Sequence, residues 1–271
     1  MISDITIGQY YRADSFVHKM DPRIKILITV LFIVMIFMCK NFLSLLLTGI
    51  FLAVSILASR VPFKMFFKSL KPIIPIVVFT AIINIFYIGG GTELISLGFL
   101  TVTSKGIFTA VFMAVRIVLL IMSSSILTYT TVPTMLTDAI ERLLSPLKVF
   151  HIQVHTLAMM MTLALRFIPT LIEEIERIMN AQKARGADFE NGGLTDRAKA
   201  LVPVLIPLFV SAFRRAYELA FAMNCRCYTG GEGRTRMKQM KLKPSDFAAL
   251  LVFAAGLAGV IMINKIFGAV I

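Results

Sequence analysis

Apolar residues along this chain gather into a few long runs that are separated by short polar connections. A run of about twenty apolar residues is the length of helix that crosses the hydrocarbon core of a bilayer. Five stretches approach or reach that length: Ile24–Cys39, Phe42–Ser59, Pro72–Ile88, Gly106–Tyr129 and a last run from Phe247 onward. The pattern therefore predicts an all-α polytopic membrane protein with about five transmembrane helices.

Residues 130–243 differ from the rest, because apolar and charged positions are mixed there with helical spacing. A short helix is expected over Pro133–Ser145, which starts with a proline and stops before the next one. We therefore expect three regions along the chain. Residues 1–129 hold four transmembrane helices, residues 130–243 form a cytoplasmic segment of amphipathic coupling helices, and residues 244–271 hold the last transmembrane helix.

Two long helices are predicted within that middle segment. The first lies in LRFIPTLIEEIERIMNAQKARG, where isoleucines recur at helical spacing and Glu173 and Arg177 stand at the favourable i,i+4 interval. The second lies in IPLFVSAFRRAYELAFAMNCRC, where an apolar stripe runs opposite Arg214 and Arg215. Each segment is expected to be a helix with one apolar and one charged face.

Both long helices close on an arginine, Arg185 in the first and Arg226 in the second. A cation at a helix C-terminus is stabilised by the exposed carbonyl groups, and Gly186 can adopt the left-handed conformation that ends a helix. The plain interpretation is a capped and solvated helix end. Two such ends, beside the small residues Ala184 and Cys225, also suit a second role in which each guanidinium group fits a socket on a partner.

The chain carries a formal net charge of +13, which in a soluble protein would suggest a nucleic-acid partner. Here the basic residues gather in the N-terminal segment, in the connection after the second apolar run and in residues 130–243. The first and third connections hold only Lys40 and Lys105. This alternation follows the positive-inside rule. It predicts a cytoplasmic N-terminus, a cytoplasmic middle segment and no nucleic-acid site.

Three stretches together resemble the transmembrane T component of energy-coupling factor (ECF) transporters, the CbiQ/EcfT-like family: HKMDPRIKIL, LRFIPTLIEEIERIMNAQKARG and IPLFVSAFRRAYELAFAMNCRCY. The resemblance covers nearly the whole chain. It implies that the two long helices are coupling helices whose Ala-Arg-Gly ends dock into two cytoplasmic ATP-binding-cassette (ABC) subunits. It also implies that those ATPases bind ATP and Mg, and that a separate membrane S component binds the substrate.

The resemblance carries over onto two triplets of this chain. Ala184, Arg185 and Gly186 match the family motif in full, whereas the second triplet, Cys225, Arg226 and Cys227, keeps only the arginine. A cysteine in a left-handed backbone conformation costs about 1 kcal/mol. We therefore expect the second helix to continue past Arg226 toward the glycine pair that follows.

Motifs of known catalysts are missing from the sequence: it contains no G-x-x-x-x-G-K-[ST], H-E-x-x-H or G-x-S-x-G. We therefore expect a non-catalytic subunit without a cofactor of its own, with ATP hydrolysis left to partners. His151 and His155 stand at i,i+4, but no third ligand lies near them in the sequence. No metal site is expected.

Arg116 lies near the middle of the fourth apolar run, where a charge is costly unless it is paired or faces a cavity. One interpretation is a polar site on a substrate or proton path. The other is a buried arginine bonded to carbonyl groups at a helix interface. The absence of Asp and Glu from the five runs favours the second interpretation, since proton paths normally include carboxylates.

Small residues also recur in the last apolar run. Ala248, Ala255 and Gly259 fall on one face of the predicted helix. Small side chains let helix backbones approach closely in a membrane. We expect this face to pack on a neighbouring helix.

Two functions of different classes follow from the sequence. The first is an energy-coupling scaffold in the cell membrane, which links two ATPases to an S component for uptake of vitamins or other micronutrients. The second is a secondary transporter or channel with its own substrate path. That alternative calls for intramembrane acidic residues or broken helices, which the sequence lacks apart from Arg116.

Overall fold

The computed structural model describes residues 10–90, 92–97, 100–150, 153–187, 189, 193–230, 240 and 242–268. These residues form two compact units. The first, here called the bundle, combines residues 10–136 with residues 240–268, so the last helix packs with the N-terminal region. The second, here called the long-helix unit, holds residues 137–230.

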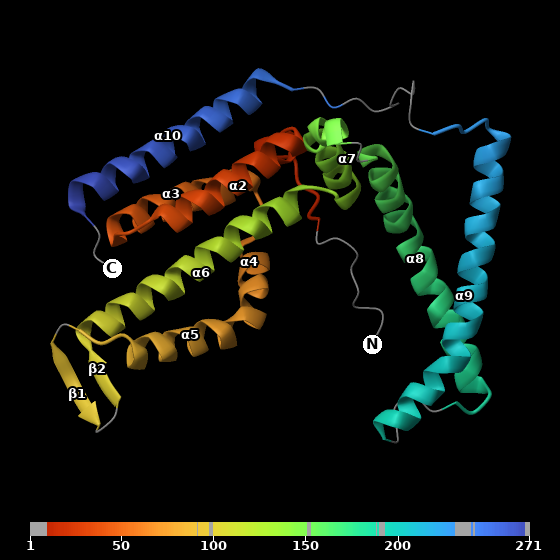
Figure 1. Ribbon diagram of the computed structural model, residues 1–271, viewed down its shortest axis with the longest axis horizontal. Coiled ribbons are helices and arrows are strands. Elements are labelled where there is room, and N and C mark those ends of the chain that lie inside the picture. Colours follow the sequence, from red (N-terminus) through yellow and green to blue (C-terminus); the bar gives the residue numbers. More distant parts are fainter. Residues whose placement is uncertain are drawn as a thin grey trace. The chain divides into compact units, whose positions relative to one another are not determined.

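The bundle is built almost entirely from helices, which Figure 1 labels in chain order. Its elements are α1 (Phe16–Lys19), α2 (Pro22–Met38), α3 (Phe42–Ser59), α4 (Phe63–Leu70), the 3-10 turn η1 (Lys71–Ile73), α5 (Ile74–Tyr87), β1 (Glu93–Leu97), β2 (Leu100–Thr103), α6 (Ser104–Thr130) and α10 (Pro244–Phe267). α7 (Pro133–Leu143) follows α6 and leads along the chain into the long-helix unit. That unit also contains η2 (Ser145–Phe150), α8 (Val154–Ala184) and α9 (Leu194–Cys225).

Four of the five predicted spans coincide with helices to within a few residues, namely α2, α3, α6 and α10. The third span is longer than predicted, because α4, η1 and α5 form one apolar helical stretch over Phe63–Tyr87. Pro72 and Pro75 lie where α4 passes through η1 into α5, and Figure 1 shows the chain bending between the two helices. Each proline stands in the first turn of its element, where no intrahelical N–H is required.

Six helices among the described residues are long and apolar enough to cross a membrane. They are Phe42–Ser59, Phe63–Tyr87, Ser104–Thr130, Val154–Ala184, Lys199–Cys225 and Pro244–Phe267. The set includes both long helices of the second unit, at a lower hydropathy than the others, and leaves out α2, which has 17 residues. An all-α polytopic membrane protein is confirmed.

A hairpin that the sequence pattern did not predict lies between α5 and α6. β1 and β2 pair antiparallel, with Glu93 opposite Thr103 and Leu97 opposite Leu100. Thr103 then caps α6, since its hydroxyl oxygen accepts a hydrogen bond from the N–H of Gly106 at 3.1 Å. The hairpin therefore ends where the long helix begins.

The core of the bundle lies among α2, α3, α6 and α10. Its fully or nearly fully buried apolar side chains include Phe32, Met35, Leu52, Phe112 and Val260. Many other large apolar side chains on these helices stay exposed, as expected where a helix faces lipid. The bundle thus has one internal core and an apolar outer surface.

The first turn of α2 is fastened to the C-terminal end of α6. The buried ammonium group of Lys25 donates a hydrogen bond to the carbonyl of Thr130 at 2.8 Å. This carbonyl ends α6, where unpaired C=O groups carry partial negative charge. Asp21 caps α2, because its carboxylate accepts a hydrogen bond from the N–H of Arg23 at 2.9 Å. The HKMDPRIKIL stretch therefore both starts α2 and terminates α6.

The packing face of α10 differs from the predicted one. Ala248 and Ala255 are exposed, so the expectation that they line the packed face is wrong. The close approach is made by Gly256, which is buried against the ring of Phe51. Gly259 does face a neighbouring helix, where Leu47 is 3.6 Å from the position of an added Cβ. The register of α10 against α3 decides which small residue makes the close contact. The periodicity of α10 alone does not reveal that register.

We predict that Gly256→Ala destabilises the bundle, because the added Cβ would lie 2.9 Å from the Phe51 ring. Overpacking of this kind typically costs about 1–3 kcal/mol. Gly259→Ala is the matched control, since its Cβ meets Leu47 at ordinary contact distance. Denaturant unfolding of the detergent-solubilised protein gives the comparison. Equal stabilities of the two variants would contradict the packing.

Candidate functional site

The first predicted arginine end, on α8, has a well-defined geometry. The N–H of Ala187 donates to the carbonyl of Gln182 at 3.0 Å, and the N–H of Gly186 donates to the carbonyl of Lys183 at 3.0 Å. Gly186 has φ of +90°. This pair of bonds around a left-handed residue is the Schellman motif, which satisfies the last carbonyls of a helix. Arg185 is thereby the last residue before the chain turns away.

The second end, on α9, repeats this geometry without a glycine. The N–H of Tyr228 donates to the carbonyl of Met223 at 3.0 Å, and the N–H of Cys227 donates to the carbonyl of Asn224 at 2.9 Å. Cys227 adopts φ of +56°. The expectation that α9 continues past Arg226 is therefore wrong. Satisfying the terminal carbonyls outweighs the cost of about 1 kcal/mol for a left-handed cysteine.

Both triplets are accessible at their helix ends. Ala184, Arg185 and Gly186 are exposed on α8, and Cys225, Arg226 and Cys227 are exposed on α9. Neither guanidinium group donates to an acceptor within the part of the chain that the structure describes. Both therefore retain forked donors that can bind carboxylates or backbone carbonyls of another protein.

α8 and α9 pack against each other, and an ion pair joins them. Nη2 of Arg215 lies 2.9 Å from the carboxylate of Glu174, with the two side chains 32% and 23% exposed. The carboxylate also lies 3.8 Å from Nη2 of Arg177. Within the described residues Arg177 therefore pairs with Glu174 at i,i+3, and the predicted pairing with Glu173 is wrong. The sequence showed which residues of α8 are charged. It did not show that Arg215 of α9 pairs with Glu174.

The ion pair lies at the same distance from the C-terminal arginine of each helix. Arg185 follows Glu174 by eleven residues, and Arg226 follows Arg215 by eleven residues. At 1.5 Å per residue, each arginine lies about 16 Å along its helix from the paired residue. Figure 1 shows the two helices running in opposite directions, so the two ends point away from each other. The result is two arms of equal length around one charged contact.

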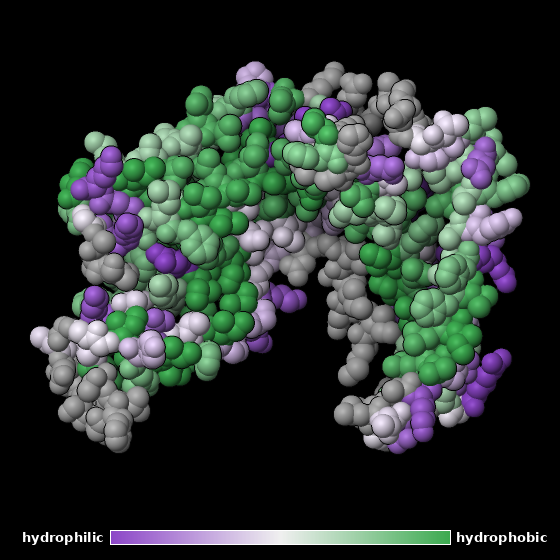
Figure 2. All heavy atoms as spheres, viewed as in Figure 1, coloured by the Kyte–Doolittle hydropathy of each residue, from purple (hydrophilic) through white to green (hydrophobic). Residues whose placement is uncertain are grey.

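The long-helix unit also presents a broad apolar surface. On α9 the side chains of Ile206, Phe209, Phe213 and Tyr217 are 60–74% exposed. Figure 2 shows hydrophobic side chains along both long helices, with hydrophilic ones gathered where α8 ends and α9 begins. Exposed apolar area of this extent marks a contact with lipid or with another protein.

Arg116 lies on α6 and reaches the end of another helix. Its Nη2 donates to the carbonyl of Cys39, the C-cap residue of α2, at 2.6 Å. The guanidinium carbon also stands 4.7 Å from the centre of the Phe112 ring, a cation–π distance. This geometry corresponds to an arginine bonded to a carbonyl at a helix interface. It gives the positive charge a partner at a helix C-terminus.

The predicted histidine pair contributes no metal centre in the described part of the chain. His151 lies outside the described residues, and Nδ1 of His155 lies 3.1 Å from a carboxylate oxygen of Glu141. Among the residues that the structure covers, no three His, Cys, Asp or Glu side chains come together in a way that could hold a metal ion. Cys39 is buried, while Cys225 and Cys227 are exposed free thiols.

Comparisons with known proteins show which family the chain belongs to. The family described as CbiQ, cobalt transport protein, matches residues 13–237. An energy-coupling factor transporter transmembrane protein EcfT of Ruminiclostridium cellulolyticum is 52% identical over 267 residues, which cover 98% of this chain and 100% of the relative. A protein of the same name from Clostridium kluyveri is 54% identical, and the match covers 93% of this chain and 93% of the relative. Another from Bacillus subtilis is 44% identical, and the match covers 94% of this chain and 97% of the relative.

The apolar helices and the family match define a multi-pass membrane protein of the transport class. Within that class, the chain belongs to the CbiQ family, the transmembrane components of ECF transporters. By family it is a non-catalytic subunit.

We predict that Cys227→Gly stabilises the end of α9 by about 1 kcal/mol, because glycine adopts positive φ without steric cost. Cys225→Ala is the control, since that residue lies within the helix. Urea unfolding in detergent, followed by circular dichroism, measures both. A Cys227→Gly midpoint at or below that of the control would show that the left-handed turn carries no strain.

Proposed function

We propose that this chain is the energy-coupling scaffold of an ATP-driven ECF-type importer. In this proposal Arg185 and Arg226 dock into two cytoplasmic ABC ATPases, which bind and hydrolyse ATP with Mg. The observation that carries the proposal is the pair of matching helix ends, each exposing an arginine at a Schellman turn. Two equal sites suit two copies, or two related forms, of one kind of partner.

The membrane side of the proposal rests on the apolar surfaces. The exposed side chains of α9 would contact an S component that captures vitamins or other micronutrients. The bundle would anchor the assembly in the cell membrane. The distribution of Lys and Arg supports a cytoplasmic location for the N-terminus and for the ends of the long helices.

In this proposal, motion of the ATPases would reach the S component through the contact of α8 with α9. When the ATPases change their separation, both arms are displaced at their ends. Glu174 and Arg215 hold the arms together at equal distances from those ends. A displacement at either end would therefore turn the whole apolar surface, and with it the S component.

A secondary transporter is less well supported. That function needs a polar site within the bilayer which is free to bind substrate or protons. The only arginine in the middle of a predicted span, Arg116, is engaged with the carbonyl of Cys39 and the ring of Phe112. Uptake by the purified chain alone in liposomes, without nucleotide, is the result that would favour this alternative.

We predict that Arg185→Ala and Arg226→Ala each weaken ATPase binding by about 2–5 kcal/mol, partly because acceptors on the partner are left unpaired. This loss is on the order of 30-fold or more in Kd. Arg214→Ala is the control, since Arg214 is exposed on α9 away from the end. Co-purification and titration with the ATPase pair provide the measurement. The proposed docking is excluded if the double variant binds normally and supports full transport.

A second prediction concerns transmission rather than docking. Glu174→Gln and Arg215→Gln should each lower ATP-driven uptake while ATPase binding stays normal. The double variant should be no worse than either single one, because both remove the same contact. Arg214→Gln is the control, since Arg214 is the exposed neighbour of Arg215 on α9. Additive losses of uptake would place the two residues in separate roles.

A further inference from the structure

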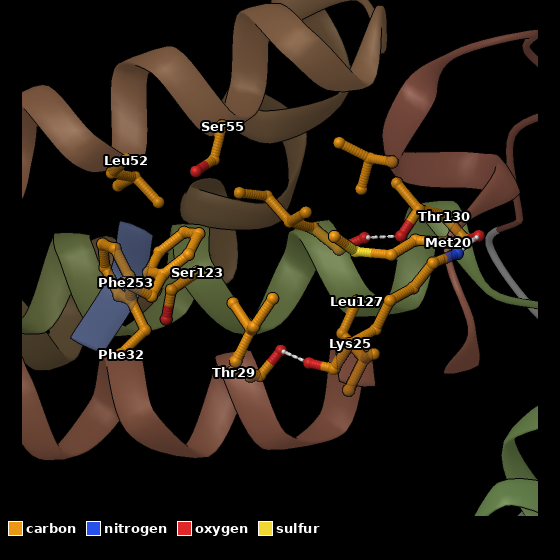
Figure 3. A pocket seen from close by; sticks show the side chains of 13 residues that line it. Met20, Lys25, Thr29, Phe32, Leu52, Ser55, Ser123, Leu127, Thr130 and Phe253 are labelled. Atoms are coloured by element: carbon orange, nitrogen blue, oxygen red, sulfur yellow. Dashed lines mark hydrogen bonds between the residues drawn. The ribbon is translucent and has the colours of Figure 1, made fainter. Parts of the chain in front are cut away.

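A partly open cavity of about 70 Å³ is lined entirely by residues of the bundle. Figure 3 shows it surrounded by side chains of α2, α3, α6 and α10, with Met20 from the segment before α2 at one end. At roughly 10–15 Å³ for each water-sized position, it has room for about five atoms of that size. Nothing in the proposed coupling role uses this space.

The wall of the cavity is mainly apolar. Phe32, Leu52 and Phe253 lie together at one end of it, as Figure 3 shows, and the rings of Phe32 and Phe253 meet edge to face at 5.7 Å. Apolar walls with a few polar groups are typical of sites for small ligands.

The polar groups of the wall are hydroxyls whose protons are already in use. Each donates to a carbonyl three or four residues earlier on its own helix: Thr29 to Lys25 at 2.8 Å, Ser55 to Phe51 at 2.8 Å, Ser123 to Leu120 at 2.8 Å and Thr130 to Ile126 at 2.7 Å. A hydroxyl oxygen that donates its proton still has lone pairs that can accept. The hydroxyl wall therefore offers acceptors and no donors.

The charged group of the wall is likewise engaged. The ammonium group of Lys25 donates to the carbonyl of Thr130, the carbonyl of His18 and the hydroxyl of Thr131, at 2.8, 3.3 and 3.4 Å. Three acceptors account for its three protons. An anionic or acceptor-only ligand would find no donor here, and a cationic ligand would meet the positive charge of Lys25.

We propose that this cavity binds the hydroxyl end of a neutral lipid, such as a long-chain alcohol or a diacylglycerol. The ligand's O–H donates to a wall hydroxyl of Ser55 or Ser123, and its first carbons fill the space beside Phe32 and Phe253. This binding would be independent of the coupling function, because it lies wholly within the bundle.

The test uses the full-length protein in phosphatidylcholine nanodiscs and two photoreactive probes. One is 1-decanol with a diazirine on its alkyl chain, and the other is its methyl ether, which has the same chain and no O–H donor. Labelled peptides are mapped by mass spectrometry. We expect the alcohol to label cavity-lining residues of α2 and α6 at least tenfold more than the ether does.

Matched variants locate the labelling. Ser123→Leu fills the cavity and should abolish the alcohol-specific labelling, whereas Ser124→Leu, at the exposed neighbouring position of α6, should leave it unchanged. Ser55→Leu fills the cavity from α3 and serves if Ser123→Leu does not fold. Equal labelling by alcohol and ether, labelling that survives the filling substitution, or labelling confined to lipid-facing residues would each overturn the proposal.

Discussion

Every helix must satisfy its last backbone carbonyls, and α8 and α9 do so with the same turn. That requirement places the arginine at the end of each helix, with its side chain at the surface. It also forces Cys227 into a left-handed conformation that glycine would adopt without strain. The two helix ends are alike because the backbone solves one hydrogen-bonding problem in one way, although their sequences share only the arginine.

The same chemistry stabilises the bundle from within. Two of its cations, Lys25 and Arg116, each bind the carbonyl at the end of a different helix, α6 in one case and α2 in the other. A carbonyl at a helix C-terminus carries partial negative charge and needs a donor. In an apolar surrounding this arrangement satisfies the cation and the helix end together, without a carboxylate in the apolar runs.

The two units divide the physical tasks of the chain. The bundle has an internal core, a close glycine contact between α3 and α10, and a first turn of α2 that is bonded to the end of α6. The long-helix unit has little buried surface. Among its described residues, a partly exposed ion pair and a hydrogen bond from the Tyr228 hydroxyl to the sulfur of Met159 join the two helices. A unit of that kind presents much apolar surface for contact with lipid or with another protein. In the proposed function, these exposed apolar residues and the two terminal guanidinium groups are surfaces of a larger assembly.

The sequence by itself determined the class of the fold, the approximate spans and the two arginine ends. Runs of apolar residues and helical periodicity are local properties, and they are visible in the order of the residues. Tertiary structure decided that Gly256, not Ala248 or Ala255, meets Phe51. It also decided that Glu174 pairs with Arg215. Both outcomes depend on the register of one helix against another, because a side chain can select a partner only after the two helices have been brought together.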